Sequence, residues 1–334
     1  MRCRRAVVSR RGGPEAMALV EDELAEPGPG EVGVRVLASG VAYGDVLKRR
    51  GLVPGTPRPP FTPGYDLVGV VERLGPGVSG LRPGDRVAAL VVNGANAERV
   101  NLKSHRAVPV PPGVDEAEAL CLVLNYVTAW QMLHRVARVR PGERILVHGA
   151  AGGVGTALLE LGRLAALEVY GTASAGKHDL VRRLGATPID HRAEDFAARV
   201  MELTGGQGVD AVFDPVAGAQ LLRSHRVLRR GGRLVCYGIS SALSVGRLQL
   251  LLTLLLLPAL MLLPDGRAAR LYGIGATAGA GMEAVREDLR ELLVLLAAGR
   301  LHPVVAERIP LSEVARAHDL VEHGRVAGKV VLVP

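Results

Sequence analysis

Residues 144–155 read Arg144-Ile145-Leu146-Val147-His148-Gly149-Ala150-Ala151-Gly152-Gly153-Val154-Gly155, a short apolar strand that runs into a glycine turn and an apolar helix. This is the pattern of a dinucleotide site, with Ala150 in place of the usual first glycine. Gly152 would let the main chain approach a pyrophosphate, Gly155 would let the helix pack on the strand, and free N–H groups at the helix start would bind phosphate. The expected cofactor contacts are Ala150, Gly152, Gly153, Val154 and Gly155.

The chain after this turn alternates strands with helices, which predicts an α/β fold with a doubly wound parallel sheet. The expected strands are 168–172, 187–190, 209–213, 233–237 and 270–274. Residues 1 to about 120 instead carry short alternating apolar runs broken by glycine and proline, which is an all-β pattern. A helix over 116–137 joins the two regions. A helix over 282–298 and strand signals at 304–305 and 330–333 predict a return to the first domain.

The net charge of +8 arises almost entirely from arginine, because lysine occurs only at positions 48, 103, 177 and 329. No basic run is interleaved with aromatic residues, so we expect no nucleic-acid partner. The basic N-terminus leads into a strand pattern and not into the apolar core of a signal peptide. Three widely spaced cysteines fit a reduced, cytoplasmic protein.

The most apolar stretch, 250–263, has fourteen residues and contains Thr253 and Pro258. It is shorter than the roughly twenty residues that span a bilayer, so we expect no membrane span. We interpret this stretch as a buried or interfacial pair of helices. The leucine content of the wider segment 248–263 suggests a greasy acceptor pocket or the surface of a homodimer.

Several blocks spread over nearly the whole chain resemble the medium-chain dehydrogenase/reductase superfamily, most closely its zinc-free quinone oxidoreductase branch. They are Gly28-Pro29-Gly30-Glu31-Val32, Pro63-Gly64-Tyr65-Asp66-Leu67-Val68-Gly69, Pro83-Gly84-Asp85-Arg86-Val87, Val139-Arg140-Pro141-Gly142-Glu143 and Gly328-Lys329-Val330-Val331-Leu332. The resemblance implies a GroES-like β-rich catalytic domain over 1–122, completed by 280–334. It also implies a Rossmann domain over 123–279 that binds NADPH.

The resemblance bears on metal binding as well. It places the zinc ligands of the related alcohol dehydrogenases at Ala42, Tyr65, Asp66 and near Asn125, where no cysteine or histidine stands. The four-cysteine structural lobe of those enzymes is missing too, since no cysteine lies between Cys3 and Cys121. We therefore expect no metal.

The choice of cofactor follows from the end of the second strand, where NAD enzymes usually place a carboxylate for the ribose hydroxyls. This chain has no carboxylate there, and Ser174 and Lys177 could donate to a 2′-phosphate, so NADPH is the better fit. The resemblance adds His191 and Arg192 beside that phosphate. Further expected cofactor contacts are Asn125, Thr128 and Gly238.

Without a metal, the acceptor must already be activated, as in a quinone or an α,β-unsaturated carbonyl. Tyr43 and Tyr65 are the candidate donors to its oxyanion. The resemblance places asparagine where Ala42 stands and, in many enoyl reductases, tyrosine near Val53. Both polar groups are absent here, which weakens the transfer of quinone reduction from the resemblance. Two alternatives stay open: an enoyl thioester or polyketide-type reductase of the same fold, and a catalytically idle NADPH-binding protein, which the missing asparagine at Ala42 favours.

Overall fold

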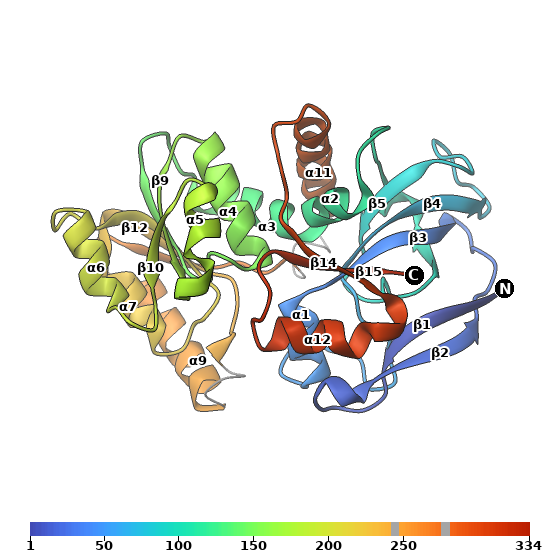
Figure 1. Cartoon of the computed structure of the whole chain (residues 1–334), viewed down its shortest axis with the longest axis horizontal. Helices are drawn as coiled ribbons and strands as arrows, with labels where there is room; N and C mark the ends of the chain where they lie inside the picture. Colours follow the sequence, from blue (N-terminus) through green and yellow to red (C-terminus); the bar gives the residue numbers. More distant parts are fainter. Residues whose placement is uncertain (242–246, 275–280) are drawn as a thin grey trace. The chain divides into compact units, whose positions relative to one another are not determined.

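The structure, a computed structural model, describes residues 1–241, 247–274 and 281–334 (Figure 1). The chain divides into two compact units, one formed by Met1–Val127 with Ile274–Pro334 and the other by Thr128–Gly273. The domain boundary expected at 279/280 lies outside the described residues.

The second unit is built on six parallel strands in the order β10-β9-β8-β11-β12-β13. The predicted doubly wound parallel sheet is therefore confirmed, although the last strand ends at Leu271 and not at residue 274. The strands are β8 (Arg144–Val147), β9 (Glu168–Ala173), β10 (Thr187–Asp190), β11 (Val209–Asp214), β12 (Leu228–Cys236) and β13 (Ala268–Leu271).

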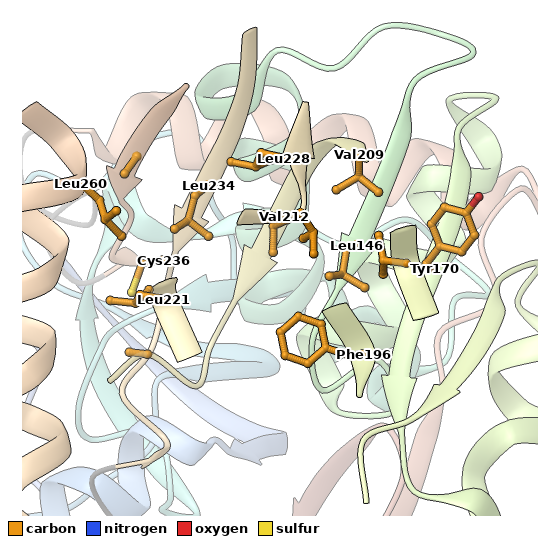
Figure 2. Packing of buried hydrophobic residues seen from close by; sticks show 14 of the residues in the cluster. Leu146, Tyr170, Phe196, Val209, Val212, Leu221, Leu228, Leu234, Cys236 and Leu260 are labelled. Carbon is orange, nitrogen blue, oxygen red and sulfur yellow. The ribbon is translucent and has the colours of Figure 1, made fainter. Parts of the chain in front are cut away.

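Helices cover both faces of this sheet (Figure 1). Phe196, Leu221 and Leu260, from three helices, pack with Leu146 and Val212 of the strands into one apolar core on a single face (Figure 2). That face carries α6 (Phe196–Leu203), α7 (Gln220–Arg226) and α9 (Arg247–Leu262), whereas α4 (Gly153–Leu164) and α5 (His178–Arg183), preceded by the turn η5 (Ala175–Lys177), lie on the other.

The apolar segment forms one helix, α9, with Pro258 inside it, so the predicted pair of helices is wrong. Leu257 and Leu260 are buried in the core, while Leu251 and Leu255 are more than half exposed. No helix within the described ranges has the length and apolar character needed to cross a bilayer.

The first unit contains a two-stranded and a seven-stranded sheet. The larger has the order β14-β15-β3-β4-β5-β7, and β6 pairs with β3. The end of the chain belongs to this unit, where β15 pairs antiparallel with β3. The strands are β1 (Arg2–Val8), β2 (Met17–Glu23), which the sequence pattern missed, β3 (Glu31–Val41), β4 (Asp66–Leu74), β5 (Arg86–Leu90), β6 (Arg99–Lys103), β7 (Val108–Pro109), β14 (Val305–Pro310) and β15 (Lys329–Val333).

The predicted helix over 116–137 is a continuous helical stretch that widens twice into π-helix. It begins at Asp115, whose carboxylate accepts from the N–H groups of Ala117 and Glu118. Its segments are α2 (Glu116–Cys121), η3 (Leu122–Tyr126), α3 (Val127–Trp130) and η4 (Gln131–Ala137). The remaining helices are α1 (Tyr43–Arg49), α11 (Met282–Ala297) and α12 (Val314–Glu322), with short turns η1 (Pro14–Ala16), η2 (Ser104–Arg106) and η6 (Leu311–Glu313).

Candidate functional site

The glycine turn between β8 and α4 is closed by main-chain contacts that exclude larger residues. A Cβ at Gly155 would overlap the carbonyl oxygen of Gly149 and lie 2.7 Å from that of Ala150. Gly149 itself has φ +64°, a left-handed conformation that favours glycine. Ala150 is tolerated because it faces Gly171 of β9, where any Cβ would lie 2.7 Å from the Ala150 methyl. The alanine variant of the motif is thus matched by a glycine on the next strand.

The N-terminus of α4 is open to an anion. Its N-cap, Gly152, has no side chain to cap the helix, and no acidic residue lies in the first turn. The N–H groups of Gly153, Val154 and Gly155 therefore have no intrahelical acceptor. A Cβ at Gly152 would meet only the Gly149 carbonyl, at 3.3 Å, so space remains for a ligand to approach the main chain. These features fit a pyrophosphate at the helix dipole.

A buried chain of hydrogen bonds lies directly beneath the turn. Thr172 Oγ1 is 3.1 Å from His148 Nδ1, and His148 Nε2 is 3.1 Å from Ser224 Oγ. Ser224 donates to Asp214 Oδ2 at 2.7 Å, and the N–H of Gly149 donates to Thr172 Oγ1 at 3.3 Å. The chain ties the ends of β8, β9 and β11 to α7. Sequence analysis missed these residues because they are polar groups spread over 76 positions.

The carboxylate fixes the direction of this chain. Asp214 can only accept, so Ser224 gives it the hydroxyl proton and accepts from His148 Nε2–H. His148 Nδ1 then accepts from the Thr172 hydroxyl, whose oxygen accepts from Gly149 N–H. Burial lowers the pKa of His148, which keeps the imidazole neutral as this arrangement requires.

Basic side chains gather where β9 and β10 end. Lys177 follows β9 and Arg192 follows β10, and these strands are parallel neighbours, so both cations lie at the same edge of the sheet. Burial first, and then the positive charge of Arg192, lower the pKa of Lys177. Ser174 precedes the turn that carries Lys177, and its carbonyl accepts from the Lys177 N–H at 2.9 Å. His191 is exposed beside Arg192. The structure thus brings together the residues expected to read a 2′-phosphate. His178, 3.2 Å from the Ala173 carbonyl oxygen, is a neighbour that the sequence analysis did not include.

The remaining expected cofactor contacts differ in what they offer. Asn125 and Thr128 are both 5% exposed, and Thr128 Oγ1 has no hydrogen-bond partner among the described residues, so it is left for a ligand or water. A Cβ at Gly238 would lie 2.7 Å from the Pro215 carbonyl oxygen. Close packing of two loops therefore requires glycine at 238, whether or not a cofactor binds there.

The two candidate tyrosines lie in the first unit. Tyr43 begins α1, and Tyr65 directly precedes β4. Burial, and then Glu322, raise the pKa of Tyr43 to about 12, and burial followed by Asp45 raises that of Tyr65 as well. Both phenols therefore stay protonated at neutral pH and are able to donate a hydrogen bond.

Asp45 has a structural role. Its carboxylate accepts from the N–H groups of Ala42 and Gly64, each at 3.0 Å. The first bond caps α1, and the second holds the residue before Tyr65 against that helix. Lys48, one helical turn after Gly44, was missed by the sequence analysis. The sequence did contain a signal for it: Lys48 follows Gly44 by four residues and Asp45 by three, a spacing that places all three on one face of the helix.

The positions that correspond to zinc ligands do not form a metal site. Ala42 has no donor atom, and Asp66 is bound to the Lys329 ammonium, 2.6 Å away. Within the ranges that the structure describes, no three His, Cys, Asp or Glu side chains are grouped so that they could hold a metal ion. The residues present therefore do not fit zinc.

Comparisons with known proteins place this fold in a family. Residues 28–113 match the alcohol dehydrogenase GroES-like domain, and residues 184–332 match the zinc-binding dehydrogenase domain. The synaptic vesicle membrane protein VAT-1 homolog of Rattus norvegicus is 35% identical over 316 residues, which cover 92% of this chain and 78% of that protein. The chain belongs to the medium-chain dehydrogenase/reductase superfamily.

Solved structures of this superfamily resemble the chain over nearly its whole length. Quinone oxidoreductase from Escherichia coli, solved in complex with NADPH, has a TM-score of 0.89 and 29% identity, covering 99% of this chain and all of that one. The CurK enoyl reductase has a TM-score of 0.85 and 26% identity, covering 99% of both chains. A mycocerosic acid synthase-like polyketide synthase of Mycobacterium tuberculosis is 34% identical over 310 residues, which are 92% of this chain and 14% of that protein. The chain is thus an oxidoreductase of this superfamily, and its similarity to an NADPH complex supports a nicotinamide nucleotide as its cofactor.

Proposed function

We propose that this protein is an NADPH-dependent oxidoreductase that reduces a quinone or an α,β-unsaturated carbonyl without a metal ion. The observation that carries the proposal is that the open N-terminus of α4 and the Lys177 and Arg192 cations all follow the carboxyl ends of the adjacent parallel strands β8, β9 and β10. The first suits the pyrophosphate and the second suits a 2′-phosphate. The similarity to a quinone oxidoreductase solved with NADPH supports the same assignment.

The residues at the zinc positions favour an activated acceptor. A simple ketone needs a Lewis acid or a strong donor for its oxygen, and Ala42 and the ion-paired Asp66 supply neither. A quinone or enone accepts hydride readily, because the negative charge is delocalised onto oxygen. Such an acceptor is mostly apolar, so the protein would need few polar side chains to bind it.

When bound, NADPH supplies a hydride from its nicotinamide ring to the ring or β-carbon of the acceptor. The N–H groups of Gly153, Val154 and Gly155 and the side chains of Ser174, Lys177, His191 and Arg192 hold the coenzyme. Tyr65, with Tyr43 as the second candidate, donates to the oxygen on which negative charge develops.

A second acceptor class has its own support. The similarity to a segment of a polyketide synthase and to the CurK enoyl reductase favours an enoyl thioester. The chemistry at the β-carbon is the same, so these alternatives differ only in how the carbonyl is substituted. A protein that binds NADPH and reduces nothing is the third alternative.

The test is to mix the purified protein with NADPH and a panel of quinones, enones and enoyl thioesters, and to follow the coenzyme absorbance. We expect turnover with quinones or enones and weaker turnover with NADH. Turnover with enoyl thioesters alone would select the second alternative. Tight NADPH binding without turnover on any acceptor would select the idle protein and refute the enzyme assignment. Stoichiometric zinc that is required for turnover would refute the metal-free part.

We further propose that the protein acts as a cytoplasmic homodimer. Leu248, Leu251, Leu255 and Leu262 are each more than half exposed on α9, and Leu271 is 65% exposed on the edge strand β13. A second copy would cover this apolar surface. Sedimentation of the wild type and of Leu251→Glu/Leu255→Glu tests the dimer, which the double substitution should dissociate. The three cysteines are free and buried, as suits a reducing compartment.

A further inference from the structure

Lys48 is a buried cation. It is only 4% exposed, although lysine is normally a surface residue. Its ammonium group donates to the Val92 carbonyl oxygen and, at 2.9 Å, to Asn93 Oδ1. The same nitrogen lies 3.5 Å from the centroid of the Tyr65 ring. Two hydrogen bonds and one cation–π contact therefore occupy the three N–H directions of this ammonium.

The carbonyl group that Lys48 holds belongs to a strained residue. Val92 has φ +73°, and a β-branched side chain rarely adopts this left-handed conformation. The N–H groups of Val91 and Val92 both donate to the Tyr65 carbonyl oxygen, at 2.7 and 3.1 Å. The strained segment is therefore fixed to Lys48 on one side and to Tyr65 on the other. Strain of this kind is retained where the surrounding structure over-determines it, commonly at functional sites.

Helix α1 also leaves space for the phenol. A Cβ at Gly44 would lie 2.8 Å from the Tyr65 hydroxyl oxygen, so the hydroxyl end of the ring lies against this glycine. One residue later, Asp45 binds the N–H of Gly64, which precedes Tyr65. Three residues of α1 therefore fix the position of Tyr65. Gly44 leaves room for its hydroxyl, Asp45 holds the residue before it by a hydrogen bond, and Lys48 lies over its ring.

We infer that Lys48 is a positioning residue for Tyr65: it holds the phenol ring in place, and its ammonium charge stabilises the phenolate that forms when Tyr65 gives up its proton. The inference rests on the proposed function, in which Tyr65 serves the oxyanion. Because the ammonium lies over the ring face, it interacts with negative charge that is delocalised into the ring without blocking the hydroxyl.

Bound NADPH would supply the hydride by losing a C–H bond of its nicotinamide ring. A C–H bond would form at the β-carbon of the enone, and the displaced electron pair would move onto the carbonyl oxygen. The Tyr65 O–H bond breaks, its proton goes to that oxygen, and the phenolate remains beside the Lys48 ammonium. Water then returns a proton to Tyr65. The net reaction consumes one NADPH and one proton for each acceptor reduced.

The test compares Lys48→Met, which keeps the apolar stem and loses the charge, with Tyr65→Phe and with the double substitution. Each single variant should lower kcat about 10-fold or more, with little change in the KM for NADPH. The double variant should be no slower than Tyr65→Phe alone, because Lys48 acts through Tyr65. Lys48→Arg, which keeps a positive charge, should recover part of the loss. Lys103→Met, at an exposed lysine paired with Glu31, is the matched control and should leave kcat unchanged.

Independent losses that multiply in the double variant would overturn the inference, as would wild-type kcat in Lys48→Met. A second measurement needs no acceptor. In protein labelled with 3-fluorotyrosine, the fluorine signal assigned through Tyr65→Phe should move in Lys48→Met, while the other tyrosine signals report an intact fold. An unmoved signal refutes the pairing itself, whereas a moved signal without turnover on any acceptor refutes the proposed function. The two failures are therefore distinguishable.

Discussion

Lys329 and Asp66 form a buried ion pair, in which the ammonium nitrogen lies 2.6 Å from Oδ2 and the side chains are 2% and 0% exposed. The pair joins β15, at the end of the chain, to β4, 263 residues earlier. A Cβ at Gly40 of β3 would overlap both groups, so the glycine makes room for the pair. Burial raises the pKa of Asp66, and Lys329 opposes that rise. The ion pair thus occupies a place that the superfamily resemblance associates with a zinc ligand.

Removing one partner of this pair should be costly. Lys329→Met leaves the Asp66 carboxyl buried without its cation, which we expect to lower the free energy of unfolding by about 3 to 5 kcal/mol. The measurement is urea unfolding at neutral pH. Replacing both residues, in Lys329→Met/Asp66→Leu, should recover a large part of the loss, because no charge then remains buried. A double variant less stable than the single one would contradict this account.

The hydrogen-bond chain under the glycine turn should set coenzyme affinity. Thr172→Val keeps the shape of the side chain but loses the acceptor for Gly149 N–H and the donor to His148. The turn then loses its support, and we expect NADPH to bind about 10-fold more weakly, which corresponds to roughly 1.4 kcal/mol. Isothermal titration calorimetry measures this without turnover.

Thr172→Ser is the matched control, because it keeps the hydroxyl and should bind NADPH as the wild type does. Nitrogen NMR of the His148 ring should find the proton on Nε2 in the wild type and in the serine variant. Equal NADPH affinity of the valine and serine variants would show that the hydrogen-bond chain does not affect coenzyme binding.

The preference for NADPH over NADH should depend on the basic cluster. Lys177→Ala removes a cation near Arg192, and we expect about a 10-fold to 100-fold loss of NADPH affinity with little change for NADH. Ser174→Asp adds a carboxylate that repels a 2′-phosphate and suits a ribose diol, so it should shift preference toward NADH. Paired dissociation constants for the two coenzymes test both substitutions. Equal losses for NADPH and NADH would refute the phosphate assignment.

A buried histidine should make stability depend on pH. His318 on α12 is fully buried, and neither ring nitrogen has a hydrogen-bond partner among the described residues. Burial, and then the positive charge of Arg49, lower the pKa of His318 to about 3. Below the unfolded pKa of roughly 6.5, the unfolded chain binds a proton that the folded chain does not. The free energy of unfolding therefore keeps its full value above roughly pH 6.5 and decreases as the pH falls below it.

We expect the buried, neutral His318 to lower the free energy of unfolding by about 1.4 kcal/mol for each pH unit below roughly pH 6.5. In His318→Leu the free energy of unfolding should fall less steeply between pH 7.5 and 5, measured by urea denaturation. His105→Leu, at an exposed histidine, is the control and should keep the wild-type slope. Identical slopes for all three proteins would show that His318 takes up its proton in the folded state.

Local patterns predicted much of the architecture. The strand, glycine turn and helix at 144–164 are readable because period-2 and period-3.6 hydrophobicity and glycine placement are local signals. The helix over 116–137 was predicted, but its two π-helical segments were not, because one extra residue in a turn leaves little trace in the apolar pattern. Strand β2 was missed because apolar and polar residues do not alternate along it: its first four residues, Met17 to Val20, are apolar and its last three are acidic.

Residue types at fixed short spacings were enough to predict the doubly wound sheet and the glycine turn, because both signals are local. No local pattern predicts that Lys48 lies over Tyr65, that His148 is held between Thr172 and Ser224, or that Lys329 pairs with Asp66. These contacts depend on strand register and helix placement over tens to hundreds of residues. Buried polar groups must find partners, and only the folded chain specifies which partners are within reach.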